Sequence, residues 1–270
     1  MHLSEKEFQH IVCYVKGRYG IDLSQKRVLI SGRLENYLLR NGYQSYSEYI
    51  RMVEQNPTGS EAVNLVNVLT TNHTYFMREF IHFEYLQKCV LPWIKTTQEN
   101  RGKDVRIWSA ASSTGEEPYT IQMVLSDFFN LDKVWDTQIL ATDISTKVLE
   151  KAKSGVYLAE QLQSVPENWK RRYFRNINPE EYQVKDEIRR KIIFRTFNLM
   201  DEIPFRGKFH VVFLRNVMIY FEEETKRQLL ERIYQHMADG GYLFIGTTES
   251  IDKTSTRFQY VQPSIYRKIV

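Results

Sequence analysis

The sequence has little cysteine and no spacing of residues that suggests a metal site. Only Cys13 and Cys89 occur among 270 residues, and neither belongs to a C-x-x-C pair. A disulfide framework and a zinc site are therefore not expected, and a reducing compartment is favoured. The histidines show no ligand spacing either, so we expect no metal. They are His2, His10, His73, His82, His210 and His236.

Long apolar runs are also absent. Spanning a bilayer takes about 20 consecutive apolar residues, and no stretch approaches that length. Residues 1–8 are polar and carry Glu5 and Glu7, which is unlike a secretory signal peptide. We therefore expect a cytoplasmic protein, and we expect it to be a monomer.

A strong charge of either sign is missing as well. The chain is 42% hydrophobic and 26% charged, as folded soluble proteins are, and its formal net charge is +4. That charge suits an acidic protein partner but is small for a dedicated nucleic-acid binder. Residues 165–195 are basic, yet the chain has no D/N-P-P-Y motif and no Pro-Cys nucleophile. We therefore predict no nucleic-acid partner.

What the sequence does contain begins with helical patterns. A capping box at Ser4 and Glu7 precedes apolar residues at helical spacing, and Gly20 can end that helix. Similar patterns predict helices at about 25–40, 45–56 and 62–69. We predict an all-α N-terminal domain over residues 1–69, followed by a connecting segment at 70–104.

From residue 105 the pattern changes to short apolar runs separated by helical patterns. These runs lie at 105–110, 138–142, 192–194, 209–214 and 242–246, and residues 264–269 resemble an edge strand. Such alternation is typical of a parallel sheet covered by helices. We predict an α/β, Rossmann-like domain at 105–270, interrupted by an inserted β subdomain at about 157–195.

The loop after the first strand is the strongest site candidate. Residues 108–119 read WSAASSTGEEPY, with small residues that let a ligand approach the backbone. The loop is neither a Walker loop nor G-x-G-x-x-G, and its Glu116 and Glu117 would repel phosphates. They would favour a positively charged ligand, such as a sulfonium. A simple strand-to-helix turn, with Thr114 as cap, is an equally good interpretation.

Polar residues also follow the later strands. Asp143 ends the second strand, where a carboxylate can accept both hydroxyls of a ribose, although an N-cap is the commoner role. Asn198 and Asn216 lie just past two further strands and could bind an adenine edge and an amino-acid group. Their alternative is the ordinary use of Asn in turns.

At this point the chain resembles the chemotaxis receptor methyltransferases, the CheR family. The resemblance covers nearly the whole chain through WSAASSTGEEPY at 108–119, LTTNHTYFMRE at 69–79, NL at 198–199, RNVMIYF at 215–221 and GTTES at 246–250. It implies methyl transfer from S-adenosylmethionine to glutamate side chains on the cytoplasmic helices of bacterial chemoreceptors, with S-adenosylhomocysteine as product. The protein would then contact a membrane only through the receptors.

The resemblance also implies site residues. The implied cofactor contacts are Asn72, Thr74, Arg78, Glu117 (with Glu116 as the alternative), Asp143, Asn198, Leu199, Asn216 and Val217. Arg78 is further expected to orient a carboxylate, and Tyr220 to donate a hydrogen bond to the substrate carboxylate. A core tyrosine is an equally good interpretation of Tyr220. A glutamate with an ordinary pKa of about 4.3 is already ionised, so no general base is required.

Two departures from the family pattern change the expected partner contacts. The second helix is often strongly basic in the family, but here RLENYLLR at 33–40 is diluted by Glu35 and Asn36. Members that dock on a receptor tether peptide carry a glycine in the insertion, but RNINPEEY at 175–182 has none. We predict independence from a tether peptide. A cofactor-binding sensor and a carboxyl methyltransferase for another substrate, including a small molecule, stay open.

Overall fold

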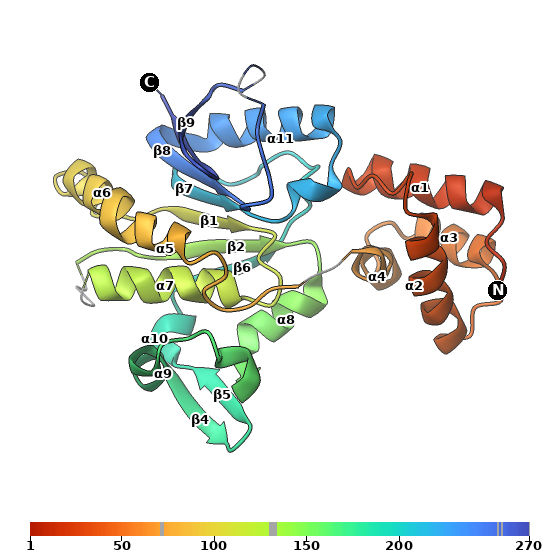
Figure 1. Cartoon of the computed structure of the whole chain (residues 1–270), viewed down its shortest axis with the longest axis horizontal. Helices are drawn as coiled ribbons and strands as arrows, with labels where there is room; N and C mark the ends of the chain where they lie inside the picture. The colour runs from red at the N-terminus through yellow and green to blue at the C-terminus, as the bar shows by residue number, and fades with distance from the viewer. Residues whose placement is uncertain (71–72, 130–133, 253, 255, 270) are drawn as a thin grey trace.

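The computed structural model describes residues 1–70, 73–129, 134–252, 254 and 256–269. It is an elongated molecule in which helices α1 to α4 form one end and a sheet with its covering helices forms the other (Figure 1). Among the described residues, no helix has the length and apolar character that a membrane span requires.

The N-terminal helices pack around a core of their own apolar residues. Their bounds are Glu5–Tyr19 (α1), Arg27–Arg40 (α2), Tyr46–Gln55 (α3) and Ser60–Leu69 (α4). The predicted capping box is present, because the Ser4 side chain accepts from the backbone N–H of Glu7 and the Glu7 carboxylate accepts from that of Ser4. Ile30, Leu34 and Leu38 recur along α2 and are fully buried. The helical periodicity thus marks the buried faces.

The second part is built on a seven-stranded sheet of order β6-β2-β1-β7-β8-β10-β9. The strands are Ile107–Ala110 (β1), Ile139–Asp143 (β2), Ile192–Thr196 (β6), Phe209–Leu214 (β7), Met237–Ile245 (β8), Phe258–Gln262 (β9) and Ile265–Lys268 (β10). The first five in that order pair in parallel, and β10 pairs antiparallel with β8 and β9. Strand β9 was not predicted, and β8 begins five residues before the predicted 242.

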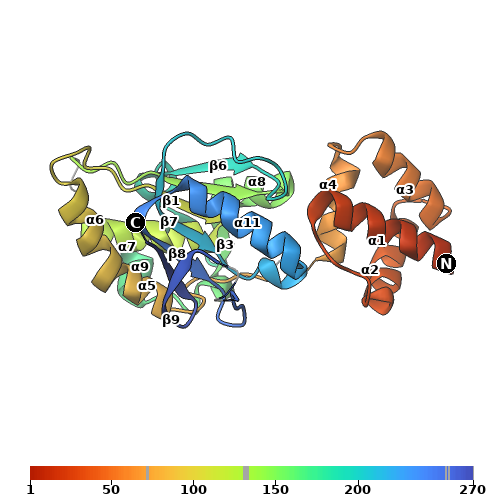
Figure 2. The same ribbon diagram turned by 90° about the horizontal axis from the view of Figure 1, so that it is seen from above.

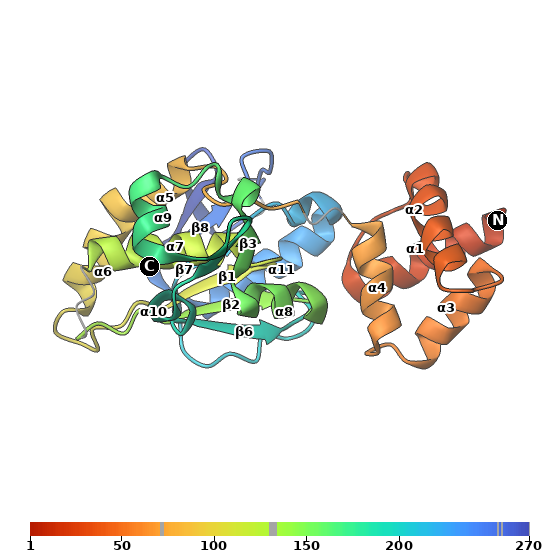
Figure 3. The same cartoon turned by 90° about the horizontal axis from the view of Figure 1, so that it is seen from below.

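Helices cover both faces of this sheet. They are Ile81–Tyr85 (α5), Leu86–Val90 (η1), Leu91–Gln98 (α6), Glu116–Phe128 (α7), Thr146–Ser154 (α8) and Glu223–His236 (α11), with a short turn at Met218–Tyr220 (η3). Successive residues of β1 point to opposite faces of the sheet. Ile107 packs in the apolar cluster under α5 to α7, and Trp108 packs in the cluster that includes α11. Figures 2 and 3 show the same layers from above and below.

The inserted segment forms a separate small sheet of order β3-β5-β4. Its elements are Val156–Leu158 (β3), Ala159–Leu162 (η2), Glu167–Tyr173 (α9), Phe174–Asn178 (β4), Glu181–Val184 (β5) and Asp186–Arg189 (α10). All its strand pairs are antiparallel. The predicted fold class is confirmed, whereas residues 192–195 of the predicted insertion belong to β6 of the main sheet.

The helical end and the sheet are joined by specific contacts. Ile21 and Phe221 form an isolated antiparallel β-bridge, and the backbone N–H of Asp22 donates to the carbonyl oxygen of Tyr220 at 2.8 Å. One apolar cluster runs continuously from α1 to α11. Because this interface lies beside Tyr220, the N-terminal helices take part in shaping the surface described next.

Candidate functional site

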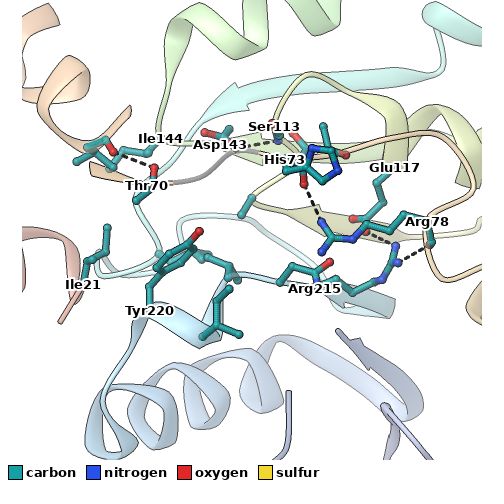
Figure 4. Close-up of a pocket in the computed structure, with 18 of the residues that line it drawn as sticks. Ile21, Thr70, His73, Arg78, Ser113, Glu117, Asp143, Ile144, Arg215 and Tyr220 are labelled. Carbon is teal, nitrogen blue, oxygen red and sulfur yellow. Dashed lines mark hydrogen bonds and ion pairs between the residues drawn. The ribbon is translucent and has the colours of Figure 1, made fainter. Parts of the chain in front are cut away.

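A cavity of about 290 Å³ opens where the carboxyl ends of β1, β2, β6 and β7 meet the N-terminal helices (Figure 4). The chain turns from β1 to β2 on one side and later to β7 on the other, so this is the switch point at which open α/β sheets bind ligands. Ile21 and Val66 of the helical domain contribute to its wall.

The loop after β1, residues 111–115, forms one side of the cavity and is called the donor loop below. Ala111, Ser113 and Gly115 all have positive φ, at 59°, 48° and 98°. Gly115 is the N-cap of α7 without a side-chain bond, and the Thr114 hydroxyl donates to Glu116 rather than capping the helix. The loop therefore lacks the side-chain cap of an ordinary strand-to-helix turn.

Asp143 lies at the end of β2 with its carboxylate at the cavity. One oxygen accepts from the backbone N–H of Ser113 at 2.8 Å, and the other from that of Ser145 at 2.9 Å. Burial raises the pKa of this carboxyl above its ordinary value. The N-cap of α8 is Ser145, so Asp143 is not needed for that role. Its remaining lone pairs can accept the two hydroxyls of a ribose.

Glu116 and Glu117, the first two residues of α7 after the donor loop, point in different directions. Glu117 lines the cavity, and its oxygens accept from the Ser109 hydroxyl and from Arg215, each at 2.7 Å. Glu116 is 1% exposed and accepts from the Thr114 hydroxyl, and its burial raises the pKa of its carboxyl. Glu117 is therefore the residue available to a ligand.

Arg215 follows β7 and forms the centre of a charge network at the floor of the cavity. Its side chain is only 2% exposed and lies 2.7 Å from Glu117 and 3.3 Å from Glu79. It also donates to the carbonyl oxygen of Arg78 at 2.5 Å. Burial raises the pKa of Glu79, but Arg215 and the hydrogen bond from Asn216 bring it below its ordinary value. The network fixes a carboxylate on each side of one buried cation.

Arg78 belongs to the segment at residues 73–79, called the strap below, that crosses the cavity. One guanidinium nitrogen donates to the carbonyl oxygen of His73 at 2.7 Å, and the group lies 5.9 Å from the Tyr75 ring centroid. Its side chain is 27% exposed and lines the cavity, as does Thr74. Arg78 is thus held over the cavity while part of it stays accessible.

Asn216 also lines the cavity and adopts a left-handed conformation, with φ of 58°. Its backbone N–H donates to Glu249 at 2.8 Å, and the same carboxylate accepts from the backbone N–H of Gly246 and of Ile219. Glu249 of the GTTES motif therefore braces the loop that carries Asn216. Val217 and Tyr220, from the same RNVMIYF segment, also line the cavity.

Among the predicted cofactor residues that the structure describes, Asn198 does not line the cavity. The Asn198 side chain donates to the carbonyl oxygen of Arg18 at 2.9 Å and accepts from the backbone N–H of Met200, so it faces the helical domain. Its neighbour Leu199 does line the cavity. Asn72 lies outside the described residues. The Asn198 side chain thus has partners outside the cavity lining, and its contact with a cofactor stays a prediction.

Sequence reasoning assigned no role to Arg215, Ser109, Ile144 or Phe197. Arg215 had a usable signal, because an arginine directly after a mostly apolar strand must be paired if it is buried. The Ser109 side chain lies on the face of β1 that meets Glu117, but in the sequence it resembled any other strand residue. Ile144 and Phe197 line the cavity, and nothing in their local pattern distinguished them.

The residues present fit an S-adenosyl ligand. Glu117 lies at one part of the cavity and Asp143 at another, with apolar Ile144, Phe197 and Leu199 among the lining residues. Carboxylates suit an α-amino group and a ribose, and apolar walls suit an adenine ring. Among the described residues, no group of three or more His, Cys, Asp or Glu side chains is arranged to hold a metal ion.

Comparison with known families agrees with this geometry. The model described as "CheR methyltransferase, SAM binding domain" matches residues 72–267, and "CheR methyltransferase, all-alpha domain" matches residues 6–70. The chain belongs to the CheR methyltransferase family. The helical end is thus the all-α domain of that family, and the sheet with its cavity is its S-adenosylmethionine-binding methyltransferase domain.

Two relatives match this chain over nearly the whole length of both proteins. A chemotaxis protein methyltransferase of Borreliella burgdorferi is 36% identical, covering 99% of this chain and 96% of the relative. Chemotaxis protein methyltransferase 1 of Pseudomonas aeruginosa is 37% identical, covering 99% of each. The solved DszA carbon methyltransferase is 17% identical with a TM-score of 0.40 over 63% of this chain and 36% of that one, which is too distant to support a conclusion.

Proposed function

We propose that this CheR-family protein transfers the methyl group of S-adenosylmethionine to glutamate carboxylates on the cytoplasmic helices of bacterial chemoreceptors. The observation that carries the proposal is one cavity that joins Asp143 and Glu117 for the donor with Arg78 and Tyr220 for the acceptor. We further propose that the protein acts as a monomer in the cytoplasm, meets the membrane only through receptors, and binds neither nucleic acid nor metal.

The reaction requires placement more than acid–base chemistry. A glutamate with a pKa of about 4.3 is ionised at neutral pH, so its oxygen can attack without losing a proton. The new oxygen–carbon bond forms while the carbon–sulfur bond breaks in line with it, leaving a methyl ester and S-adenosylhomocysteine. Holding the two reactants in that line is the main task of the site.

Arg78 and Tyr220 are the residues proposed to place the carboxylates. The guanidinium of Arg78 presents planar paired donors that match a carboxylate, and its contact with the carbonyl oxygen of His73 leaves further N–H groups for a ligand. Tyr220 lines the cavity beside the contact with the helical domain, where its phenol can donate to the acceptor carboxylate. Both should orient the nucleophile while leaving it charged.

We propose that methylation does not depend on a receptor tether peptide. The β4–β5 turn has no glycine, and it is closed by Asn178, whose side chain accepts from the backbone N–H groups of Glu180 and Glu181 at 3.0 and 2.9 Å. The turn is therefore complete without a bound peptide. Tight, specific capture of the protein by an immobilised tether peptide would refute this part of the proposal.

The deciding experiment uses methyl-labelled S-adenosylmethionine and membranes rich in chemoreceptors. Base-labile label on a receptor-sized band is expected, because carboxyl methyl esters hydrolyse in mild base. Arg78→Ala should abolish most labelling without lowering the unfolding midpoint, whereas Arg227→Ala, at an exposed ion pair, should label as the wild type does.

The alternatives correspond to distinct outcomes. Binding of S-adenosylhomocysteine without receptor labelling would point to a cofactor sensor or to another carboxylate substrate, and base-labile label on a small molecule would identify the latter. Absence of any binding would refute the proposed donor site itself.

A further inference from the structure

A buried side chain of the insertion contacts a loop that lines the methyl-donor cavity. Tyr157 in β3 is 0% exposed, although it belongs to the small sheet that lies outside the main one. Its hydroxyl donates to the carbonyl oxygen of Thr114, in the donor loop, at 2.6 Å. Tyr157 itself does not line the cavity, so its contact with the site is indirect.

The donor loop needs such support because its backbone is unusual. Non-glycine residues rarely adopt positive φ, yet Ala111 and Ser113 do so within this short stretch. Gly115, also at positive φ, packs so closely that an added Cβ would lie 3.0 Å from the Tyr157 hydroxyl. Tyr157 therefore fills the space behind the loop and also bonds to it.

The same side chain also supports the strap. Phe76 is 0% exposed, and its ring stands edge-on to Tyr157, with centroids 4.8 Å apart, and to Phe174 of β4 at 5.5 Å. The hydroxyl of Ser164 donates to the carbonyl oxygen of Phe76 at 2.6 Å. The insertion thus anchors the strap two residues before Arg78.

We propose that the insertion is a structural support of the methyl-donor site, and that Tyr157 is a positioning residue that sets the donor loop and the strap together. This inference rests on the proposed donor site. Linkage requires the effect to be reciprocal: if the insertion holds the cavity in its binding shape, a ligand in the cavity must also stabilise the insertion.

The test measures S-adenosylhomocysteine binding by calorimetry for wild type, Tyr157→Phe and Tyr173→Phe. Tyr173 is a matched control, because it is also a fully buried insertion tyrosine, but its hydroxyl donates to Asp127 on α7 instead of the donor loop. Loss of the bond to Thr114 should weaken binding about threefold to tenfold. Tyr173→Phe should bind as the wild type does, even if it is equally or more destabilised.

A second variant and a second measurement separate positioning from general damage. Ser164→Ala removes only the bond from an exposed serine to the strap and should weaken binding in the same direction. For Tyr157→Phe, the KM for S-adenosylmethionine should rise while kcat at saturation stays near that of wild type. Hydrogen exchange of the wild type should show that S-adenosylhomocysteine protects the amides of Val156–Leu158.

The outcomes distinguish this inference from the proposed function. Equal affinity of wild type and Tyr157→Phe, or equal loss in Tyr157→Phe and Tyr173→Phe, would overturn the positioning role and leave the donor site intact. No protection of β3 on ligand binding would overturn the coupling. If the wild type failed to bind S-adenosylhomocysteine, the donor site would fall and this inference with it.

Discussion

Replacing Arg215 by methionine tests the charge network more directly than any other change. Methionine keeps most of the length and apolar stem of the side chain but removes the cation. The change leaves Glu117 and Glu79 without the partner that lies 2.7 Å and 3.3 Å away in the wild type. It also removes the bond to the carbonyl oxygen of Arg78, which helps to hold the strap.

The expected cost follows from burial. The Arg215 side chain is 2% exposed, and those of Glu79 and Glu117 are 12% and 14% exposed. Removing one partner of a buried ion pair costs about 3–5 kcal/mol. Because both carboxylates keep some exposure to solvent, we expect the lower end, about 3 kcal/mol. Arg215 lowers the pKa of Glu79, so without it that pKa rises, and the deficit should shrink as the pH is lowered toward protonation of Glu79.

The assay is urea unfolding at pH 7 and at about pH 5, with S-adenosylhomocysteine titration on the folded variant. The control is Arg227→Met, because the Arg227 side chain is 52% exposed and its pair with Glu224 is screened by solvent, so its loss should change stability little. A loss below about 1 kcal/mol for Arg215→Met, together with unchanged affinity, would refute the network as a structural and functional unit.

Three further predictions concern single residues. Burial lowers the pKa of the His82 ring from 6.5 to about 4. Between pH 6.5 and 4 only the unfolded chain takes up this proton, so the free energy of unfolding of the wild type should fall by about 3 kcal/mol from this group. In urea unfolding over the same pH range, His82→Phe should lack that loss. Asn198→Ala should cost about 1 kcal/mol of stability and leave S-adenosylhomocysteine affinity unchanged, and a clear loss of affinity would restore it to the cofactor site. Tyr220→Phe should lower kcat about tenfold or more without changing that affinity, because a hydrogen bond to a charged group is lost at the acceptor; unchanged turnover would remove Tyr220 from the mechanism.

Much of the fold could be predicted because local sequence patterns indicate most of its helices and strands. The capping box at Ser4 and the spacing of Ile30, Leu34 and Leu38 depend only on neighbours within one or two helical turns. The parallel strands could also be recognised in the sequence as short apolar runs, because both faces of such a sheet are buried. Strand β9 was missed because its pattern is mostly exposed, with Phe258 as its buried residue.

Only part of the candidate site could be predicted from the sequence. Asp143 was identified because ligands gather at the carboxyl ends of strands, which is a rule of topology that sequence order reveals. The sequence could not show whether Glu116 or Glu117 faces the cavity. Consecutive residues on a helix point about 100° apart, so the answer depends on how α7 is rotated against the sheet. The tertiary structure selects Glu117 by pairing it with Ser109 and Arg215.

The sequence by itself determined the α/β class, the helical N-terminal domain and the family, because each rests on local periodicity or on motifs in order. Only the tertiary structure decided that Arg215 joins Glu79 and Glu117, that Asn198 faces Arg18, and that Tyr157 of the insertion supports the donor loop. Each of these contacts joins side chains from segments far apart in the chain. Their meeting depends on how separate strands, helices and the insertion pack together, and no local pattern encodes that packing.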